Sequence, residues 1–190
     1  MRTLEQRDDG LVWFLFAVPA VVLVLLVTLG RSDEMPGAIE VVQTPGSPVT
    51  IEAARLGLDE TAMTVMTLRA RGPADSFKVR VYVYDAAGKA KGIAARVLGK
   101  VGPEAQTYVL PLGEWVLEDT DRVKVMVVAR RSRPSDPMPN ETYCGSNFCV
   151  EERKACVSTC GSGCVARFSC KLGTTCESDC FCKSTPACGG

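Results

Sequence analysis

The feature that most constrains this chain is the confinement of all ten of its cysteines to the residues after 143. An even number of closely spaced cysteines in a short segment is typical of a disulfide framework. Such frameworks persist in oxidising compartments outside the cytoplasm. A segment this short buries too little apolar surface to fold on a core alone, so bridges are needed to stabilise it. The sequence therefore predicts a cysteine-rich disulfide module over residues 144–190.

An apolar run near the amino terminus gives independent information on location. The run from Leu11 to Leu29, LVWFLFAVPAVVLVLLVTL, contains no charged residue. A helix of about 20 such residues spans the roughly 30 Å hydrocarbon core of a bilayer. We therefore predict a transmembrane helix over residues 11–30, with the lipid bilayer as a partner of the chain. A cleaved signal peptide is the alternative, but its apolar core would be shorter, and Thr28-Leu29-Gly30 is a poor cleavage site.

Flanking charge sets the predicted orientation of that helix. Arg2, Arg7 and the amino terminus precede the apolar run, and Arg31 is the one cation that follows it closely. Lys and Arg favour the cytoplasmic side of a membrane, whereas acidic residues have little influence. Residues 1–10 are then a cytoplasmic tail, and residues 31–37 are a short linker on the outer side. The predicted protein is a single-pass signal-anchor protein of the cell membrane, with the bulk of its chain periplasmic or extracellular.

The stretch 38–131 has the two-residue periodicity of half-buried strands. In residues 78–84, Val79, Val81 and Val83 fall on one face, and residues 122–128 alternate in the same way. Weaker strand candidates, separated by turns that contain Pro or Gly, are 39–43, 49–58, 62–71, 92–98 and 107–112. About seven short strands without a strong amphipathic helix between them indicate an all-β sandwich. Their number and spacing resemble the immunoglobulin and fibronectin type III group of sandwiches.

Residues 132–143 form the predicted connection between the sandwich and the cysteine module. Their first part, SRPSDPMPN, contains three prolines, which exclude a helix or a central strand. We interpret the segment as a semi-rigid spacer. Asn140-Glu-Thr142 matches a glycosylation sequon, which has meaning only in a eukaryotic source.

The cysteine module itself is predicted to contain one helix and two short strands. Residues 151–160 are good helix formers with the acidic residues first, and a helix places Cys156 and Cys160 one turn apart on one face. Gly161-Ser-Gly163 would end this helix. The strand candidates are residues 165–170 and 180–183.

This order of helix, glycine loop and hairpin, with a Cys-x3-Cys on the helix and Cys180-Phe-Cys182 on the last strand, resembles the cysteine-stabilised αβ scaffold of defensins and scorpion-type toxins. In that family the first cysteine pairs with the fourth, the second with the fifth and the third with the sixth. The resemblance therefore implies the disulfides Cys149–Cys170, Cys156–Cys180 and Cys160–Cys182. Four cysteines are left without an assigned partner: Cys144, Cys164, Cys176 and Cys188.

Three other interpretations of the cysteines stay open. Thiolates spaced Cys-x3-Cys would suit a structural zinc site, although Cys-x2-Cys is the commoner spacing. The spacing of Cys156 and Cys160, repeated in Cys176 and Cys180, also resembles the twin Cys-x3-Cys pattern of small intermembrane-space chaperones. Finally, Cys180-Phe-Cys182 would suit a membrane-tethered thiol–disulfide redox protein.

Composition argues against most catalytic chemistry. The chain has no histidine, which removes the commonest general base and the commonest metal ligand. We expect no catalytic residue, no cofactor and no metal, and therefore no enzyme. Asp119 and Asp121 form a carboxylate pair, which we interpret as a solvated turn before a strand. A net charge of zero provides no general attraction to nucleic acid, so we expect no nucleic-acid partner.

These features favour a non-enzymatic binding or structural role over the redox alternative. The anchor fixes position, the spacer gives reach, and a bridged module offers stiff loops at little entropic cost on binding. A membrane-complex subunit or an extracellular component is the expected protein partner. Trp115, near a strand end, is expected in the core. The candidate contact residues are the apolar or cationic side chains of the module: Phe148, Val165, Arg167, Phe168 and Phe181.

The predicted topology can be tested by protease protection. Protease added to intact cells or spheroplasts should remove residues 31–190, because they are expected to lie outside the cytoplasm. An epitope tag fused at the amino terminus provides the control, since a cytoplasmic tail should survive the same treatment. Cleavage of the large domain only after permeabilisation would show that the predicted orientation is wrong.

Overall fold

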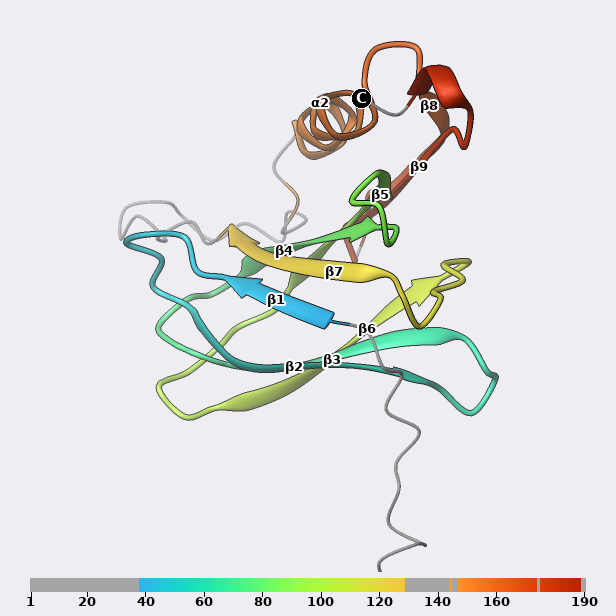
Figure 1. The fold of residues 1–190 in the computed structure, drawn as a ribbon. Coiled ribbons are helices and arrows are strands. Elements are labelled where there is room, and N and C mark those ends of the chain that lie inside the picture. Colours follow the sequence, from blue (N-terminus) through green and yellow to red (C-terminus); the bar gives the residue numbers. More distant parts are fainter. Residues whose placement is uncertain (1–37, 129–143, 145–146, 174, 189–190) are drawn as a thin grey trace, which may run out of the picture. The chain divides into compact units, whose positions relative to one another are not determined.

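A computed structural model describes residues 38–128, 144, 147–173 and 175–188 of the chain. Seven strands in two sheets precede a helix and a β-hairpin (Figure 1). A mostly β-sheet, sandwich-like fold with a C-terminal disulfide-rich segment is thereby confirmed. The predicted transmembrane helix lies outside the described residues, as do the linkers 31–37 and 132–143. Among the residues that are described, no helix is long and apolar enough to span a membrane.

The strands of the sandwich lie close to where the periodicity predicted them. They are β1 (Ala38–Val42), β2 (Thr50–Leu58), β3 (Thr64–Arg71), β4 (Phe77–Tyr84), β5 (Ala90–Leu98), β6 (Gln106–Gly113) and β7 (Arg122–Val128). The module contributes α2 (Phe148–Cys160), β8 (Val165–Lys171), β9 (Glu177–Cys182) and a 3-10 helix, Pro186–Cys188. The helix begins at Phe148 rather than at Glu151, and it ends at Cys160, directly before Gly161, as the sequence predicted.

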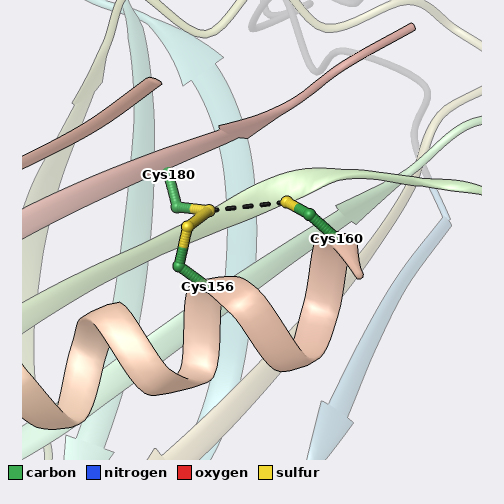
Figure 2. Close-up of side chains that lie close together, drawn as sticks. All are labelled: Cys156, Cys160 and Cys180. Carbon is green, nitrogen blue, oxygen red and sulfur yellow. Dashed lines mark hydrogen bonds between the residues drawn. A yellow bond between two sulfur atoms is a disulfide. The ribbon is translucent and has the colours of Figure 1, made fainter. Parts of the chain in front are cut away.

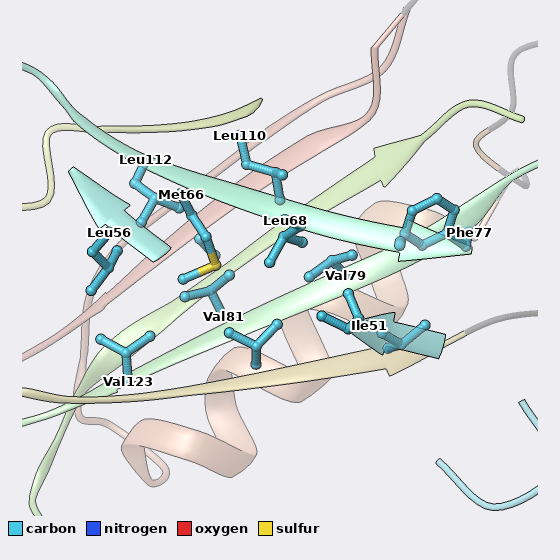
Figure 3. Packing of buried hydrophobic residues seen from close by; sticks show 14 of the residues in the cluster. Ile51, Leu56, Met66, Leu68, Phe77, Val79, Val81, Leu110, Leu112 and Val123 are labelled. Atoms are coloured by element: carbon cyan, nitrogen blue, oxygen red, sulfur yellow. The ribbon is translucent and has the colours of Figure 1, made fainter. Parts of the chain in front are cut away.

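The apolar core lies between the two sheets and follows the predicted period of two. One sheet has the order β2-β3-β6, and the other has the order β1-β7-β4-β5-β9-β8. Val79, Val81 and Val83 of β4 are almost fully buried, as are alternate residues of β7. Each buried aliphatic side chain stabilises the fold by about 1.5–3 kcal/mol. The facing sheet contributes, among others, Met66, Leu68, Leu110 and Leu112 (Figure 3).

The module is joined to the sandwich through its last strand. β9 is hydrogen-bonded beside β5 in an antiparallel pair that runs from Gly92 opposite Phe181 to Arg96 opposite Glu177 (Figure 1). The N–H of Val97 extends the contact by donating to the carbonyl of Cys176 at 3.0 Å. The described residues accordingly belong to one compact unit, residues 35–190. The module and the sandwich therefore share a sheet, because β9 of the module pairs with β5 of the sandwich.

The helix α2 covers β5 on the side away from the sandwich core. It packs against β5, β8 and β9. Ile93 and Ala95 of β5, 3% and 0% exposed, belong to clusters with cysteines of the module, whereas Ala94 between them belongs to the sandwich core. β5 is thus buried on both faces, which explains why its central residues show no alternation of burial.

Gly92 marks the closest approach between β5 and its neighbours and provides a test of this joint. A Cβ at Gly92 would lie 2.0 Å from the carbonyl oxygen of Cys180 and 2.5 Å from Cη2 of Trp115. Gly92→Ala should therefore lower the free energy of unfolding by about 1–3 kcal/mol, the range for overpacked positions. Urea denaturation measures the change. Gly99→Ala is the matched control, because a Cβ there has no heavy atom within 4 Å. Equal stability of the two variants would contradict the close β5–β9 contact.

Candidate functional site

Five disulfides hold the module, and they include every cysteine of the chain. They are Cys144–Cys176, Cys149–Cys170, Cys156–Cys180, Cys160–Cys182 and Cys164–Cys188. The second, third and fourth are the pairs that the resemblance to the αβ scaffold implies, and these three connect α2 to β8 and β9. A disulfide typically stabilises a fold by about 2–4 kcal/mol, mainly by restricting the unfolded chain. The position of α2 on the hairpin is therefore covalently fixed along its length.

Three buried sulfur atoms of this framework lie close together (Figure 2). The Sγ atoms of Cys156, Cys160 and Cys180 lie within 4.8 Å of one another, and Cys160 Sγ is 3.5 Å from Cys180 Sγ. Metal binding by cysteine requires thiolates. Each of these sulfurs is instead bonded to a second sulfur, so in the disulfide form the cluster is a contact between two neighbouring bridges.

A buried carboxylate on the inner side of α2 attaches the helix to the sandwich. Glu152 is 2% exposed and accepts hydrogen bonds from Lys78 Nζ at 2.7 Å and from Arg80 Nε and Nη2 at 2.9 and 2.8 Å. Desolvation alone would lower the pKa of Arg80, but the hydrogen bonds and charge of Glu152 outweigh it and raise the pKa above its ordinary value. The guanidinium of Arg80 is thereby held in its charged form beneath the helix.

Arg96 of β5 makes the equivalent connection on the other side of the sheet. The residue is 7% exposed. Its Nη1 donates to the carbonyls of Ala95 and Ser178 at 2.9 Å each, its Nη2 to Asp179 Oδ1 at 2.9 Å and its Nε to the carbonyl of Pro111 at 3.1 Å. Because Pro111 belongs to β6 and the other partners to β5 and β9, one guanidinium links the module to both sheets.

Trp115 and Phe181 form the apolar part of this joint. Trp115 is 3% exposed, which confirms its expected place in the core. Its ring stacks on Phe181 with the centroids 4.5 Å apart, and its Nε1 donates to Asp179 Oδ1 at 3.3 Å. Arg167 lies over the Phe181 ring, 4.6 Å from the centroid, and pairs with Glu114. The candidate contact residue Phe181 is therefore partly buried in the joint and partly exposed beside Arg167.

Of the two carboxylates that precede β7, one is exposed as predicted from the sequence and the other is buried. Asp119 lies in an exposed turn, but Asp121 is 2% exposed. Its Oδ2 accepts hydrogen bonds from Lys91 Nζ at 2.8 Å and from the backbone N–H of Glu118 at 2.9 Å. The interpretation as a solvated turn is wrong for Asp121, which ties the turn to β5.

The five candidate contact residues of the module are distributed between interior and surface. Phe148 is 5% exposed and packs with Ala95 and two cysteines. Phe181 is partly buried, as described above. Arg167 is exposed, and Val165 and Phe168 are half-buried on β8. Val165 and Phe168 therefore lie beside α2, whereas Arg167 lies over Phe181. The candidate residues do not form one continuous surface.

Val165 and Phe168 border a concave surface between the helix and the hairpin, here called the α2–β8 groove. It consists of two adjoining hollows of 220 and 690 Å³, which share Arg153, Val157 and Phe168 in their lining. Val150 and Val157 are 54% and 40% exposed. The residues that α2 adds to the groove, none of which the sequence singled out, include Val150, Arg153, Lys154 and Val157.

The spacing of these helix residues carried a signal that the sequence reasoning missed. At 3.6 residues per turn, Val150 and Val157 fall on one face, with Arg153 and Lys154 flanking it. Glu152 falls on the opposite face, which is the buried one. A helix with cysteines and an acidic residue on one side and valines on the other therefore exposes an apolar stripe.

No protein-family model matches this chain, and it has no significant match among curated proteins or among solved structures.

The buried carboxylate of α2 can be tested against its exposed neighbour. Glu152→Ala leaves Lys78 and Arg80 without their shared buried partner, and breaking a buried pair in this way typically costs about 3–5 kcal/mol. Glu151, whose side chain is 40% exposed and lies 3.3 Å from Lys78 Nζ, is the matched control. Glu151→Ala should cost at most about 1 kcal/mol. Urea denaturation at neutral pH compares them, and similar losses would contradict the central role of Glu152.

Proposed function

We propose that this chain is a single-pass, membrane-anchored protein that acts outside the cytoplasm in a non-enzymatic binding or structural role. A β-rich domain with five disulfides is consistent with an extracellular structural role. The apolar run from Leu11 to Leu29 would hold it at the membrane. An immunoglobulin- or fibronectin-like sandwich and the disulfide module would together present one surface to a protein partner.

The observation that carries this proposal is the position of α2. Three disulfides and Glu152 fix one side of the helix, and the other side exposes Val150 and Val157. Apolar side chains that are 54% and 40% exposed contribute less to the stability of the fold than fully buried ones. A surface that is already rigid loses little conformational entropy when a partner binds. The outer side of α2 is therefore suited to recognition.

The redox alternative has one observation in its favour, the contact between the Cys156–Cys180 and Cys160–Cys182 disulfides at 3.5 Å. Thiol–disulfide exchange, however, needs an attacking thiol to reach one of the sulfurs. Cys156, Cys160 and Cys180 are 0%, 8% and 1% exposed, and Cys182 is half-buried. Catalytic cysteines are typically accessible and lie in an electropositive environment. The burial of three of these four cysteines therefore favours a structural role for the two bridges.

Partner capture with point variants tests the proposal. The full-length protein, affinity-tagged and crosslinked in its native membrane, should retain specific partners. A version ending at Asn140 is unsuitable, because it would uncover Ile93 and Ala95. Val150→Asp with Val157→Asp should abolish the interaction, whereas Val109→Asp with Val116→Asp, at sandwich residues that are 60% and 80% exposed, should preserve it.

Three results would contradict parts of this proposal. Partners retained by all variants would place the binding surface elsewhere on the chain. No specific partner, together with thiol–disulfide exchange activity on a model disulfide substrate, would favour the redox alternative. Protection of the large domain from external protease would exclude a role outside the cytoplasm.

A further inference from the structure

Building on the proposed function, we propose that the α2–β8 groove binds an acidic peptide segment of the partner protein, in which carboxylates flank an apolar side chain. The groove combines an apolar lining with two cations on one exposed surface. Val150, Val157 and Phe168 provide the apolar part, and Arg153 and Lys154 provide the charge. A ligand that fits the groove should therefore carry both an apolar side chain and negative charge.

The charge of the groove results from the way α2 separates its ionic side chains. The helix contains the consecutive residues Glu151, Glu152, Arg153 and Lys154. The two carboxylates face β4, where both pair with Lys78 and Glu152 also pairs with Arg80. The two cations remain exposed at the groove. Among the described residues that line either hollow, none is acidic. A chain with no net charge therefore has a positive groove.

The apolar part of the groove includes one hollow that is smaller and more enclosed than the other. The smaller hollow, 220 Å³, lies between the helix and β8, with Val157, Val165 and Phe168 in its lining. The guanidinium of Arg153 lies 5.7 Å from the centroid of the Phe168 ring, so a cation stands at its edge. An aliphatic side chain entering this hollow would bring neighbouring carboxylates close to Arg153, which binds carboxylates with paired hydrogen bonds.

The shape of the groove favours a peptide over a lipid surface. Proteins that bind the bilayer interface insert projecting Trp, Phe or Leu side chains above a basic face. In this groove the aromatic residue, Phe168, is half-buried beneath Arg153, and the exposed apolar residues are valines. A concave surface on a helix that is held by disulfides matches a peptide segment that lies in a groove.

Binding of synthetic peptides to the full-length protein in phosphatidylcholine nanodiscs tests the proposal. The probe is a fluorescent peptide of alternating Glu and Leu pairs, with Gln-for-Glu and Lys-for-Glu versions as matched controls and empty nanodiscs as the blank. Fluorescence anisotropy should show binding of the Glu peptide, weaker binding of the Gln peptide and none of the Lys peptide. Arg153→Glu with Lys154→Glu should weaken binding of the Glu peptide about tenfold or more. The two new carboxylates of the groove would repel the carboxylates of the peptide, whereas the original cations attract them.

Two variants separate the groove from general charge and from misfolding. Lys100→Glu with Arg122→Glu changes the net charge by the same amount at exposed residues of the sandwich and should leave binding unchanged. Val157→Asp removes apolar surface and adds a like charge at an exposed residue, so it should also weaken binding of the Glu peptide. Intact mass under non-reducing conditions and near-ultraviolet circular dichroism should match the wild type in every variant.

Equal binding of the Glu peptide to the wild type and to the Arg153/Lys154 variant would overturn this inference, as would a lack of binding to both. Binding of phosphatidylglycerol vesicles, lost with the same variant and without peptide binding, would assign the groove to lipid and overturn it too. Partners in native membranes that survive Arg153→Glu with Lys154→Glu would refute the groove but preserve the proposed function. A full-length protein that captures no partner would refute the proposed function itself.

Discussion

The pairing of β9 with β5 is the contact on which the rest of the structure depends. It adds the disulfide hairpin to a sandwich sheet, and the disulfides of the hairpin then bring α2 over Ile93 and Ala95. This placement also pairs the buried charges. Arg96 donates a hydrogen bond to Asp179 of β9, and Glu152 accepts hydrogen bonds from the cations of β4. Backbone pairing, covalent bridges and buried ion pairs thus stabilise the same joint. Loss of the strand pair would remove the carbonyl of Ser178 and the carboxylate of Asp179 from Arg96, and a buried charge that loses its partners destabilises the fold.

Much of the local structure could be predicted because it follows from spacing along the chain. Alternation of valine with polar residues specified β4 and β7 and the faces that they bury, and prolines and glycines marked most of the turns. The helix and the two strands of the module were also predicted, with differences of a few residues at their ends. The resemblance to the αβ scaffold added the disulfide pairing, which the spacing of the cysteines alone does not specify. Its three implied pairs, including Cys149–Cys170, occur in the structure.

The features that were missed depend on contacts between distant parts of the chain. Glu152 lies in a run of charged residues that fits a solvated helix face, and only the approach of β4 makes it a buried residue. Arg96 similarly looks like an ordinary polar position of a strand. One local signal was present: residues 92–96 read Gly-Ile-Ala-Ala-Arg, without polar alternation at Ile93, Ala94 and Ala95. Such a run indicates a strand that is covered on both faces, and hence a further layer over the sheet.

The organisation of α2 explains how one short helix serves both the fold and recognition. A helix of 13 residues is marginal on its own, since isolated helices shorter than about 12–15 residues are rarely stable in water. Its inner side supplies the missing stability through Cys149, Cys156, Cys160 and the buried carboxylate of Glu152. These contacts lie on the inner side of the helix, whereas Val150, Arg153 and Val157 are exposed on its other side. Their side chains are therefore open to selection for a partner, and the fold that holds them tolerates changes in that surface.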